Sequence, residues 1–506
     1  MPGAGEGGST NLRDDARGAF PYAALSGGVQ ILLSLVGMLL LVRYLPPDSY
    51  GVWMVIIGLG SPLFMLTSMG FRHSLLRFMP ATEDREARTR FFWSVLIRRS
   101  YTIFPACVLL NLMFPIFSDK LGIAGQQSVL LLLTPGFLLF SLTHFLVLGL
   151  NAEFRQREVF LGSVFLQVVS VSGVLVGIQW GQGLLFFAGT QLVANACYFL
   201  FSFGAAIRYL GKPQLQDLRV KHREQPEERS YRRASFLDDL GQMLLSADFS
   251  RLILAAFAGS YQVAIYSVAS SITDRLRMLM PLEIFRPLTT VTFFKRFEET
   301  GTIEEVNRIF KFIFSINRIV TTAFLVLFVP LGQEVLVWLF REDYGASYAP
   351  AVILMIAIGV FSMPIGLVAQ TLRRPLLLVY SKLAVLLQVA VAIPLVKEYG
   401  ATGMAVAVAA GELIKNLIVF VMLRREFAIR YPWASTFRFL LAGAVVVASL
   451  WWAQSSLNVF VAGLIGGIAW VLSLRIFSVL SSDEKNLVET IVPDRFKRSV
   501  RLFLGS

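Results

Sequence analysis

Long apolar runs alternate with short polar breaks along almost the whole chain. A helix needs about 20 mainly apolar residues to cross the roughly 30 Å hydrocarbon layer of a membrane. The pattern therefore predicts an all-α polytopic membrane protein with about 14 transmembrane helices. The predicted spans are 20–42, 50–70, 97–118, 127–150, 159–178, 183–207, 236–258, 261–285, 309–331, 347–370, 375–396, 400–423, 434–454 and 457–480.

The composition agrees with a chain whose solvent is mostly lipid. Hydrophobic residues make up 56% of the 506 residues and charged residues only 16%, whereas soluble proteins have about 25% charged residues. This excludes soluble enzymes, nucleic-acid binders and secreted disulfide scaffolds. The two cysteines lie inside apolar runs and the three histidines are scattered, so we expect no metal site.

The formal charge of +13 first gives information about how the chain is oriented in the membrane, because short cytoplasmic loops hold an excess of Lys and Arg. Residues 1–19 are polar and Gly-rich and no small-residue cleavage site follows the first apolar run, so we expect no cleaved signal peptide. With the N-terminus placed in the cytoplasm, most Lys and Arg residues fall in predicted internal loops. The predicted external loops hold only Arg43, Lys120, Arg341 and Lys397. Both termini are therefore predicted to be cytoplasmic.

The most charged internal break, 208–235, follows six predicted spans and divides the chain. We predict an N-lobe at 1–207 with a disordered start and spans 1–6, a cytoplasmic linker at 208–235, and a C-lobe at 236–425 with spans 7–12. Residues 426–506 would form spans 13–14 and an amphipathic cytoplasmic tail. Six spans per lobe make the lobes parallel pseudo-repeats, and DSYGVW at 48–53 has an echo in YQVAIY at 261–266.

Charged residues inside the spans are candidates for function, because each is costly in lipid and usually faces water or a partner. Arg98 and Arg99 lie near a predicted cytoplasmic end and are expected to reach the interface along their own side chains. The deeper cations predict a cationic, substrate-binding cavity suited to an anion. Its predicted cations are Arg251, Arg275, Arg277, Arg318, Lys382 and Lys415, and the acids predicted for ion coupling or pairing are Asp248, Asp274 and Glu412.

Ion pairing within the membrane is the competing interpretation. Three acid–base pairs have the i, i+3 spacing that places both side chains on one helix face. This interpretation leaves Arg275 and Arg318 without a local acid, and both interpretations stay open. The i, i+3 pairs are Asp248 with Arg251, Asp274 with Arg277, and Glu412 with Lys415.

A further polar motif is interpreted as a helix cap: Ser235 and Asp238 are expected to form a capping box that starts span 7.

Two stretches resemble a known family. Residues 45–80 have a Pro-containing turn, a Tyr-Gly pair, Met-Gly-Phe and a terminal Arg-Phe, and residues 248–270 are similar to the family's pattern over spans 7 and 8. The chain resembles prokaryotic polysaccharide transporters, the Wzx-type lipid-linked oligosaccharide flippases of the multidrug/oligosaccharidyl-lipid/polysaccharide (MOP) exporter superfamily. It departs from them where members commonly place Asp directly before the Arg of span 7, since here Ser250 precedes Arg251.

The resemblance implies a transporter of the inner membrane rather than an enzyme. It would carry polyprenyl-diphosphate-linked oligosaccharides outward by alternating access, for O-antigen or exopolysaccharide synthesis. Its expected partners are the lipid-linked substrate, membrane lipids, and polysaccharide polymerase and export components, with no nucleic acid. No cofactor is implied, and proton or sodium coupling is left open. The alternatives are a cation-coupled drug exporter of the same superfamily, and a membrane glycosyl polymerase or ligase, which the short external loops oppose.

Overall fold

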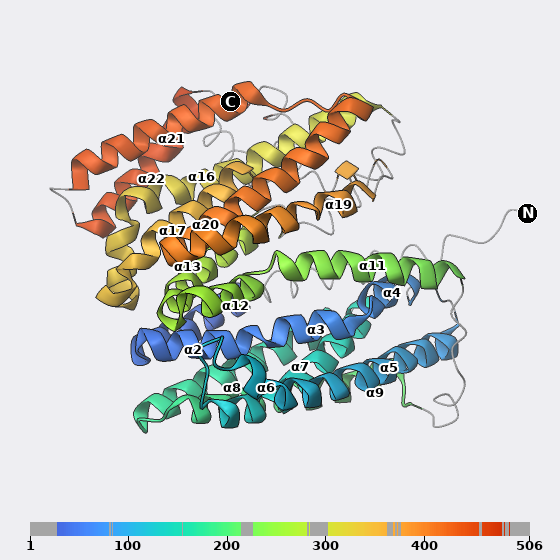
Figure 1. Ribbon diagram of the computed structural model, residues 1–506. Helices are drawn as coiled ribbons and strands as arrows, with labels where there is room; N and C mark the ends of the chain where they lie inside the picture. Colours follow the sequence, from blue (N-terminus) through green and yellow to red (C-terminus); the bar gives the residue numbers. More distant parts are fainter. Residues whose placement is uncertain are drawn as a thin grey trace, which may run out of the picture. The chain divides into compact units, whose positions relative to one another are not determined.

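The structure of the chain is a computed structural model that describes residues 28–79, 82, 84–153, 155–213, 226–280, 283, 302–361, 368–369, 372, 376–454, 458–477, 480 and 485. Helices account for almost all of these residues, and no strand occurs among them (Figure 1). The predicted disordered start and most of the predicted amphipathic tail lie outside the described residues, as do residues 214–225 of the predicted linker.

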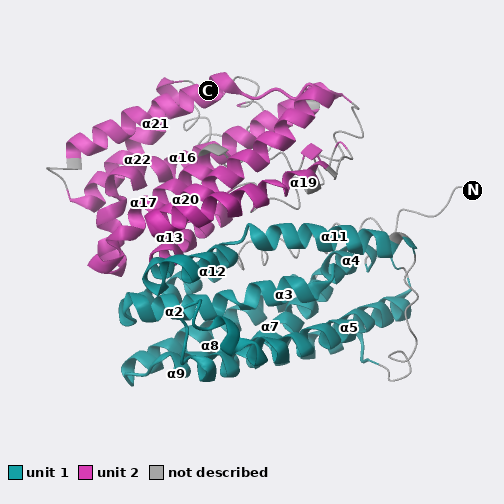
Figure 2. Ribbon diagram, viewed as in Figure 1, with its two compact units in different colours: residues 1–264 teal, residues 265–506 magenta. Residues whose placement is uncertain are grey.

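The chain divides into two compact units, residues 1–264 and 265–506 (Figure 2). Unit 1 contains a first apolar helix, Gly28–Tyr44. It is followed by α2 (Pro47–Gly58), α3 (Gly60–Ser68), α4 (Phe71–Phe78), α5 (Arg85–Leu112), α6 (Phe114–Phe117), α7 (Gln127–Ala152), α8 (Gln156–Gln179), α9 (Leu184–Leu210), α11 (Pro226–Leu244) and α12 (Ala247–Ala258). Helix α13 (Ser260–Met278) begins in unit 1 and continues into unit 2.

Large aromatic side chains form the core of unit 1. Helix α5 begins at the N-cap Asp84, whose carboxylate accepts hydrogen bonds from the backbone N–H groups of Glu86 and Ala87 at 3.1 Å. Its Phe92 is fully buried with Phe145 of α7. A Cβ at Gly149 would overlap the Phe92 ring, so the glycine lets α7 approach α5 closely.

Unit 2 is built around the 38-residue helix α16 (Ile303–Phe340). Val326 and Leu331 of α16 pack with Phe439 and Trp470 from the two last helices in one buried cluster. The other elements are η1 (Glu342–Ser347), α17 (Tyr348–Ile356), the π-helical turn η2 (Ala357–Phe361), α19 (Leu376–Ser381), α20 (Ala384–Phe427), α21 (Trp433–Gln454) and α22 (Val459–Ile476).

Helix α20 is two helices joined at a sharp turn. Its 44 residues would extend about 66 Å if straight, about twice the thickness of the hydrocarbon layer. Gly400 has φ 55° and ψ −128°, and a Cβ at Gly403 would overlap the carbonyl oxygen of Leu395. The chain therefore folds back at Gly400. The second arm matches the predicted span 400–423, whereas the predicted span 375–396 covers α19, the turn at 382–383 and most of the first arm.

Small residues let the two arms of α20 pack tightly. Gly403, Ala407 and Gly411 are buried and recur every four residues, which puts them on one helix face. A Cβ at Gly411 would overlap the amide oxygen of Gln388 on the other arm. Such small-residue stripes are how helices approach one another in lipid, where the hydrophobic effect gives no driving force.

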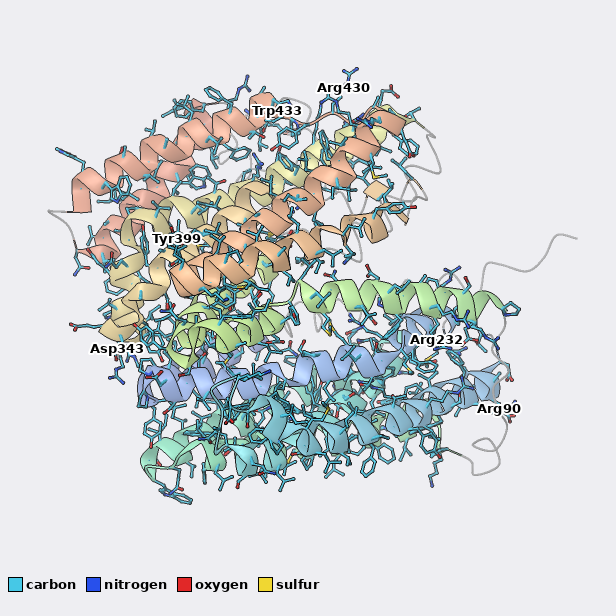
Figure 3. All side chains as sticks on the ribbon, viewed as in Figure 1. Arg90, Arg232, Asp343, Tyr399, Arg430 and Trp433 are labelled. Carbon is cyan, nitrogen blue, oxygen red and sulfur yellow. The ribbon has the colours of Figure 1, made fainter. Side chains whose placement is uncertain are left out.

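The helices confirm an all-α polytopic membrane protein. Counting α20 as one helix and α2 with α3 as another, nine helices within the described residues are long and apolar enough to span a membrane, and α11 with α12, which are bent by 47°, would make a tenth. The total of 14 stays a prediction, as do the lobe boundaries at 207, 235 and 425. In unit 2, Arg430 lies at the opposite end from Asp343 (Figure 3), as the predicted topology requires.

Candidate functional site

Three of the predicted site residues lie in the last turns of α13. Apolar residues at 263–265 and 268–269 keep the first part of α13 buried, whereas Asp274 and Arg277 are exposed and Arg275 is half-buried. The Arg275 guanidinium donates a hydrogen bond to the carbonyl oxygen of Ser271, 2.8 Å away. The end of α13 therefore carries all the charged residues of this helix.

A charge cluster in unit 2 has Glu412 at its centre. The Lys415 ammonium lies 2.6 Å from the Glu412 carboxylate, one turn away on α20. Glu412 also interacts electrostatically with Arg277 of α13 and with Lys382, which lies in the turn between α19 and α20. The fold thus brings together four of the predicted residues from three places in the sequence. Of these cations Lys415 contacts the carboxylate directly, and the charges of Arg277 and Lys382 also act on it. The four side chains together carry a net positive charge, which suits an anion.

Arg318 is held by aromatic residues. Its side chain on α16 is 4% exposed, and its guanidinium lies 4.2 Å from the centre of the Phe314 ring. It also donates a hydrogen bond to the Tyr431 hydroxyl at 2.8 Å. Stacking on an aromatic face is a frequent way to keep Arg in a poorly solvated place. A role for Arg318 in a cavity stays a prediction.

The ion pair of Asp248 and Arg251 lies in unit 1, in the first turns of α12. Ser246 caps this helix by accepting a hydrogen bond from the Phe249 N–H at 3.2 Å. Asp248 then has the position where a carboxylate suits the positive end of the helix dipole. This ion pair and that of Glu412 with Lys415, both at i, i+3 spacing, support the pairing interpretation for those residues.

Arg99 corrects one expectation. It is fully buried, because its side chain lies among α5, α3 and α7 and finds hydrogen-bond partners there instead of reaching the interface. Its guanidinium donates hydrogen bonds to the Ser141 hydroxyl and the Phe64 carbonyl oxygen, each at 2.9 Å, and to the Thr67 hydroxyl. The expectation that Arg99 reaches the interface was wrong. The hydroxyl residues Thr67 and Ser141 on neighbouring spans were the sequence feature that could have indicated buried partners for it.

Asp239 corrects a second expectation. Helix α11 begins at Pro226, so Ser235 and Asp238 lie inside it and form no capping box at its start. The next residue, Asp239, is buried and accepts a hydrogen bond from the Ser68 hydroxyl at 3.0 Å. His73 Nε2 lies 3.1 Å from its other carboxylate oxygen. Asp239 thus ties α11 to α3 and α4, a link that the sequence alone did not predict.

Metal-ligand clusters do not occur in the described part of the chain: His, Cys, Asp and Glu nowhere gather there in groups of three or more. The cysteines are both free thiols, Cys107 buried and Cys197 half-buried.

Comparison with known sequences gives one family match. The profile of a family described as "Polysaccharide biosynthesis protein" matches residues 17–293, more than half of the chain. No curated protein sequence matches.

Comparison with solved structures gives transporter folds. The lipid II flippase MurJ in an inward closed conformation has a TM-score of 0.72 at 15% identity, over 92% of this chain and 99% of that one. An inward-facing multidrug resistance MATE transporter of the MOP superfamily has a TM-score of 0.63 at 17% identity, over 79% and 94%. A MOP transporter from Pyrococcus furiosus, described as having a binding pocket of reverse polarity, has a TM-score of 0.55 at 16% identity, over 81% and 95%. The fold is thus one that this chain shares with the lipid II flippase MurJ and with MATE transporters of the MOP superfamily.

Proposed function

The chain belongs to the family of polysaccharide biosynthesis proteins, and from this premise we propose that it is a flippase for lipid-linked oligosaccharides. Its substrate would be a polyprenyl diphosphate carrying sugars, moved from the cytoplasmic to the outer leaflet of the inner membrane for O-antigen or exopolysaccharide synthesis. The observation that carries the proposal is the fold shared with a lipid flippase over 92% of this chain.

The Glu412 cluster supports a diphosphate as the recognised group. Lys415 contacts the Glu412 carboxylate and the charges of Arg277 and Lys382 also act on it, so an anion that entered would meet a surplus of positive charge. Guanidinium and ammonium groups are the usual partners of phosphate oxygens, and Arg matches them with two parallel hydrogen bonds. The cluster is therefore our first choice for the headgroup site.

Along the proposed transport path, the polar and apolar parts of the substrate stay in different environments. The diphosphate and sugars would cross through water past the cations, while the polyprenyl tail stays in the bilayer. The chain has no nucleotide-binding motif of the GxxxxGK[ST] type. We propose that the membrane potential, a proton or sodium gradient, or consumption of the product outside drives the transport. Polymerase and export components are the proposed partners.

Reconstitution tests the proposal. Full-length protein in liposomes that carry a lipid-linked oligosaccharide should expose inner-leaflet sugar to an external glycosidase. Arg277→Ala should slow exposure roughly tenfold or more, because a charge-assisted hydrogen bond contributes about 1.5–3 kcal/mol and each 1.4 kcal/mol is a factor of ten. Arg475→Ala is the matched control, since Arg475 lies exposed on α22 outside the cluster. Absence of protein-dependent exposure would reject the flippase.

The likeness to drug exporters supports a second candidate, a cation-coupled exporter of small molecules. Such a protein is expected to bind organic cations and to need acids in excess, whereas the cluster around Glu412 is basic. The same liposomes, loaded with a fluorescent organic cation, separate the two functions. Efflux of that cation without any exposure of sugar would favour the exporter.

A further inference from the structure

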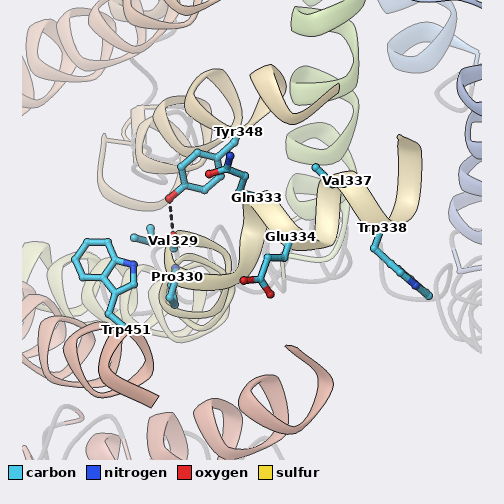
Figure 4. Close-up of a pocket in the computed structure, with 8 residues that line it drawn as sticks. All are labelled: Val329, Pro330, Gln333, Glu334, Val337, Trp338, Tyr348 and Trp451. Carbon is cyan, nitrogen blue, oxygen red and sulfur yellow. Dashed lines mark hydrogen bonds between the residues drawn. The ribbon is translucent and has the colours of Figure 1, made fainter. Parts of the chain in front are cut away.

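A cavity lies near the C-terminal end of α16, the end opposite Ile303. Its volume is about 700 Å³, and its walls come from α16, α17 and α21. This is within the usual range for a site that takes a small ligand. Figure 4 shows Glu334 between Trp338 on one side and Trp451 on the other, with Tyr348 and Gln333 close together.

The aromatic walls of this cavity are held in place. The Tyr348 hydroxyl donates a hydrogen bond to the Val329 carbonyl oxygen at 2.5 Å, and its ring stacks on Phe328 with the centroids 6.1 Å apart. The Trp338 ring packs edge-on against the Phe460 ring of α22, with the ring centroids 5.2 Å apart. Side chains that neighbours fix in one orientation give a preorganised surface. Two walls of the cavity are therefore already ordered before any ligand arrives.

The polar groups lie between these aromatic walls. Gln333 and Glu334 are exposed neighbours on α16, and they offer an amide that donates and accepts and a carboxylate that accepts. Interfacial Trp residues alone would be an ordinary feature of a membrane protein, and Trp452, which is 86% exposed and does not line the cavity, fits that description. Trp338 and Trp451 differ because a carboxylate and an amide share their cavity.

We infer that this cavity is a saccharide-binding site. Sugar rings present hydroxyls at their edges and weakly positive C–H groups on their faces, and the negative faces of Trp and Tyr rings suit the C–H groups. The Gln333 amide and the Glu334 carboxylate would then form hydrogen bonds with the hydroxyls at the edges of the sugar rings. The inference rests on the proposed function in one respect: the sugar would be the oligosaccharide of the transported lipid. The predicted topology places the cavity on the outer side of the membrane, where that sugar leaves the protein.

Binding of soluble sugars tests the site without any transport. Purified full-length protein in nanodiscs of neutral lipid is titrated with chitotriose, maltotriose and mannotriose, with intrinsic Trp fluorescence and saturation-transfer NMR as readouts. At least one trisaccharide should bind, and Glu334→Gln and Trp451→Ala should weaken that binding tenfold or more. Trp452→Ala is the matched control and should leave binding unchanged. Trp451→Phe, which keeps an aromatic face, should retain most of the affinity and guards against loss of folding.

Three results would overturn the inference. No binding by any of the three sugars is the first, and equal loss in Trp452→Ala and Trp451→Ala is the second. The third is displacement of the bound sugar by choline at equal concentration, since a carboxylate among aromatic rings could hold an organic cation instead. Flipping measured on the same variants separates the two proposals: intact flipping without sugar binding overturns only this site, and sugar binding without flipping overturns only the flippase.

Discussion

Arg99 shows how one residue can tie three helices together. Replacing it by Met removes four hydrogen bonds at once, one each to Phe64 and Thr67 of α3 and two to the Ser141 hydroxyl of α7. We expect Arg99→Met to lower the free energy of unfolding by about 1–3 kcal/mol, the range for leaving buried polar groups without their partner. Thermal unfolding in detergent measures this as a lower melting temperature.

Arg98→Met is the matched control for Arg99. Arg98 is half-buried, 6.0 Å from the centre of the Phe71 ring, so its loss should change the melting temperature little. Equal effects of the two substitutions would contradict a special role for the buried guanidinium. Arg99→Lys should recover only part of the stability, because an ammonium cannot replace a planar fork with several donors.

At this scale the sequence predicts contacts within a helix better than contacts between helices. The pairs Asp248 with Arg251 and Glu412 with Lys415 follow from i, i+3 spacing alone. The partners of Arg99 lie on other helices, and so does Arg277, which interacts with Glu412 from α13. Their positions depend on how helices pack, which spacing does not encode.

At the scale of elements, glycine contacts set how closely helices approach. A Cβ at Gly51 of α2 would overlap the backbone carbonyl oxygen of Ser260 at the start of α13. Because backbone atoms cannot rotate away, Gly51→Ala should force the two segments apart and lower the free energy of unfolding by about 1–3 kcal/mol, the usual effect of overpacking. Thermal unfolding again provides the measurement.

Gly204→Ala is the control for Gly51→Ala in the same unit. Gly204 lies within α9, where a Cβ would meet no atom within 4 Å, so alanine should stabilise the helix by about 0.5–1 kcal/mol. The two substitutions are therefore expected to shift the melting temperature in opposite directions. A shift of the same sign in both would show that the close approach at Gly51 is not what matters.

Hydropathy located most of the helices but not their ends. The runs at 127–150, 159–178 and 434–454 agree closely with α7, α8 and α21, since their polar flanks are short and clear. Helix α5 instead extends 12 residues beyond its apolar run to Arg85, and α11 begins at Pro226 within the predicted linker. Polar helical turns that project from a membrane give no hydropathy signal, so packing rather than composition sets those ends.

At the scale of the whole molecule, a flippase for a diphosphate moves negative charge across the membrane. Outward movement is favoured by an inside-negative potential by about 2.3 kcal/mol per charge per 100 mV. We therefore expect faster exposure of inner-leaflet sugar in the liposomes when a potassium gradient with valinomycin makes the interior negative. Reversing the gradient should slow the exposure.

The potential also distinguishes ways of driving transport. If exposure does not respond to either sign of potential, a cation must travel with the substrate and cancel its charge. Repeating the measurement with imposed proton and sodium gradients then identifies that cation. A response opposite in sign would contradict net outward movement of negative charge.

The tight turn at Gly400 has a practical consequence for mapping which side of the membrane each loop faces. Reporter domains and epitope tags need a loop that can be lengthened. Here the two arms of α20 are in contact, with Gly403 packed against Leu395. An insertion at this turn would therefore separate the two arms whose topology it is meant to report. A single cysteine adds no length. Tyr399 is 56% exposed beside the turn, while Cys107 is buried, so an impermeant thiol reagent added to cells that carry Tyr399→Cys in a background without Cys197 would report the side on which this turn lies.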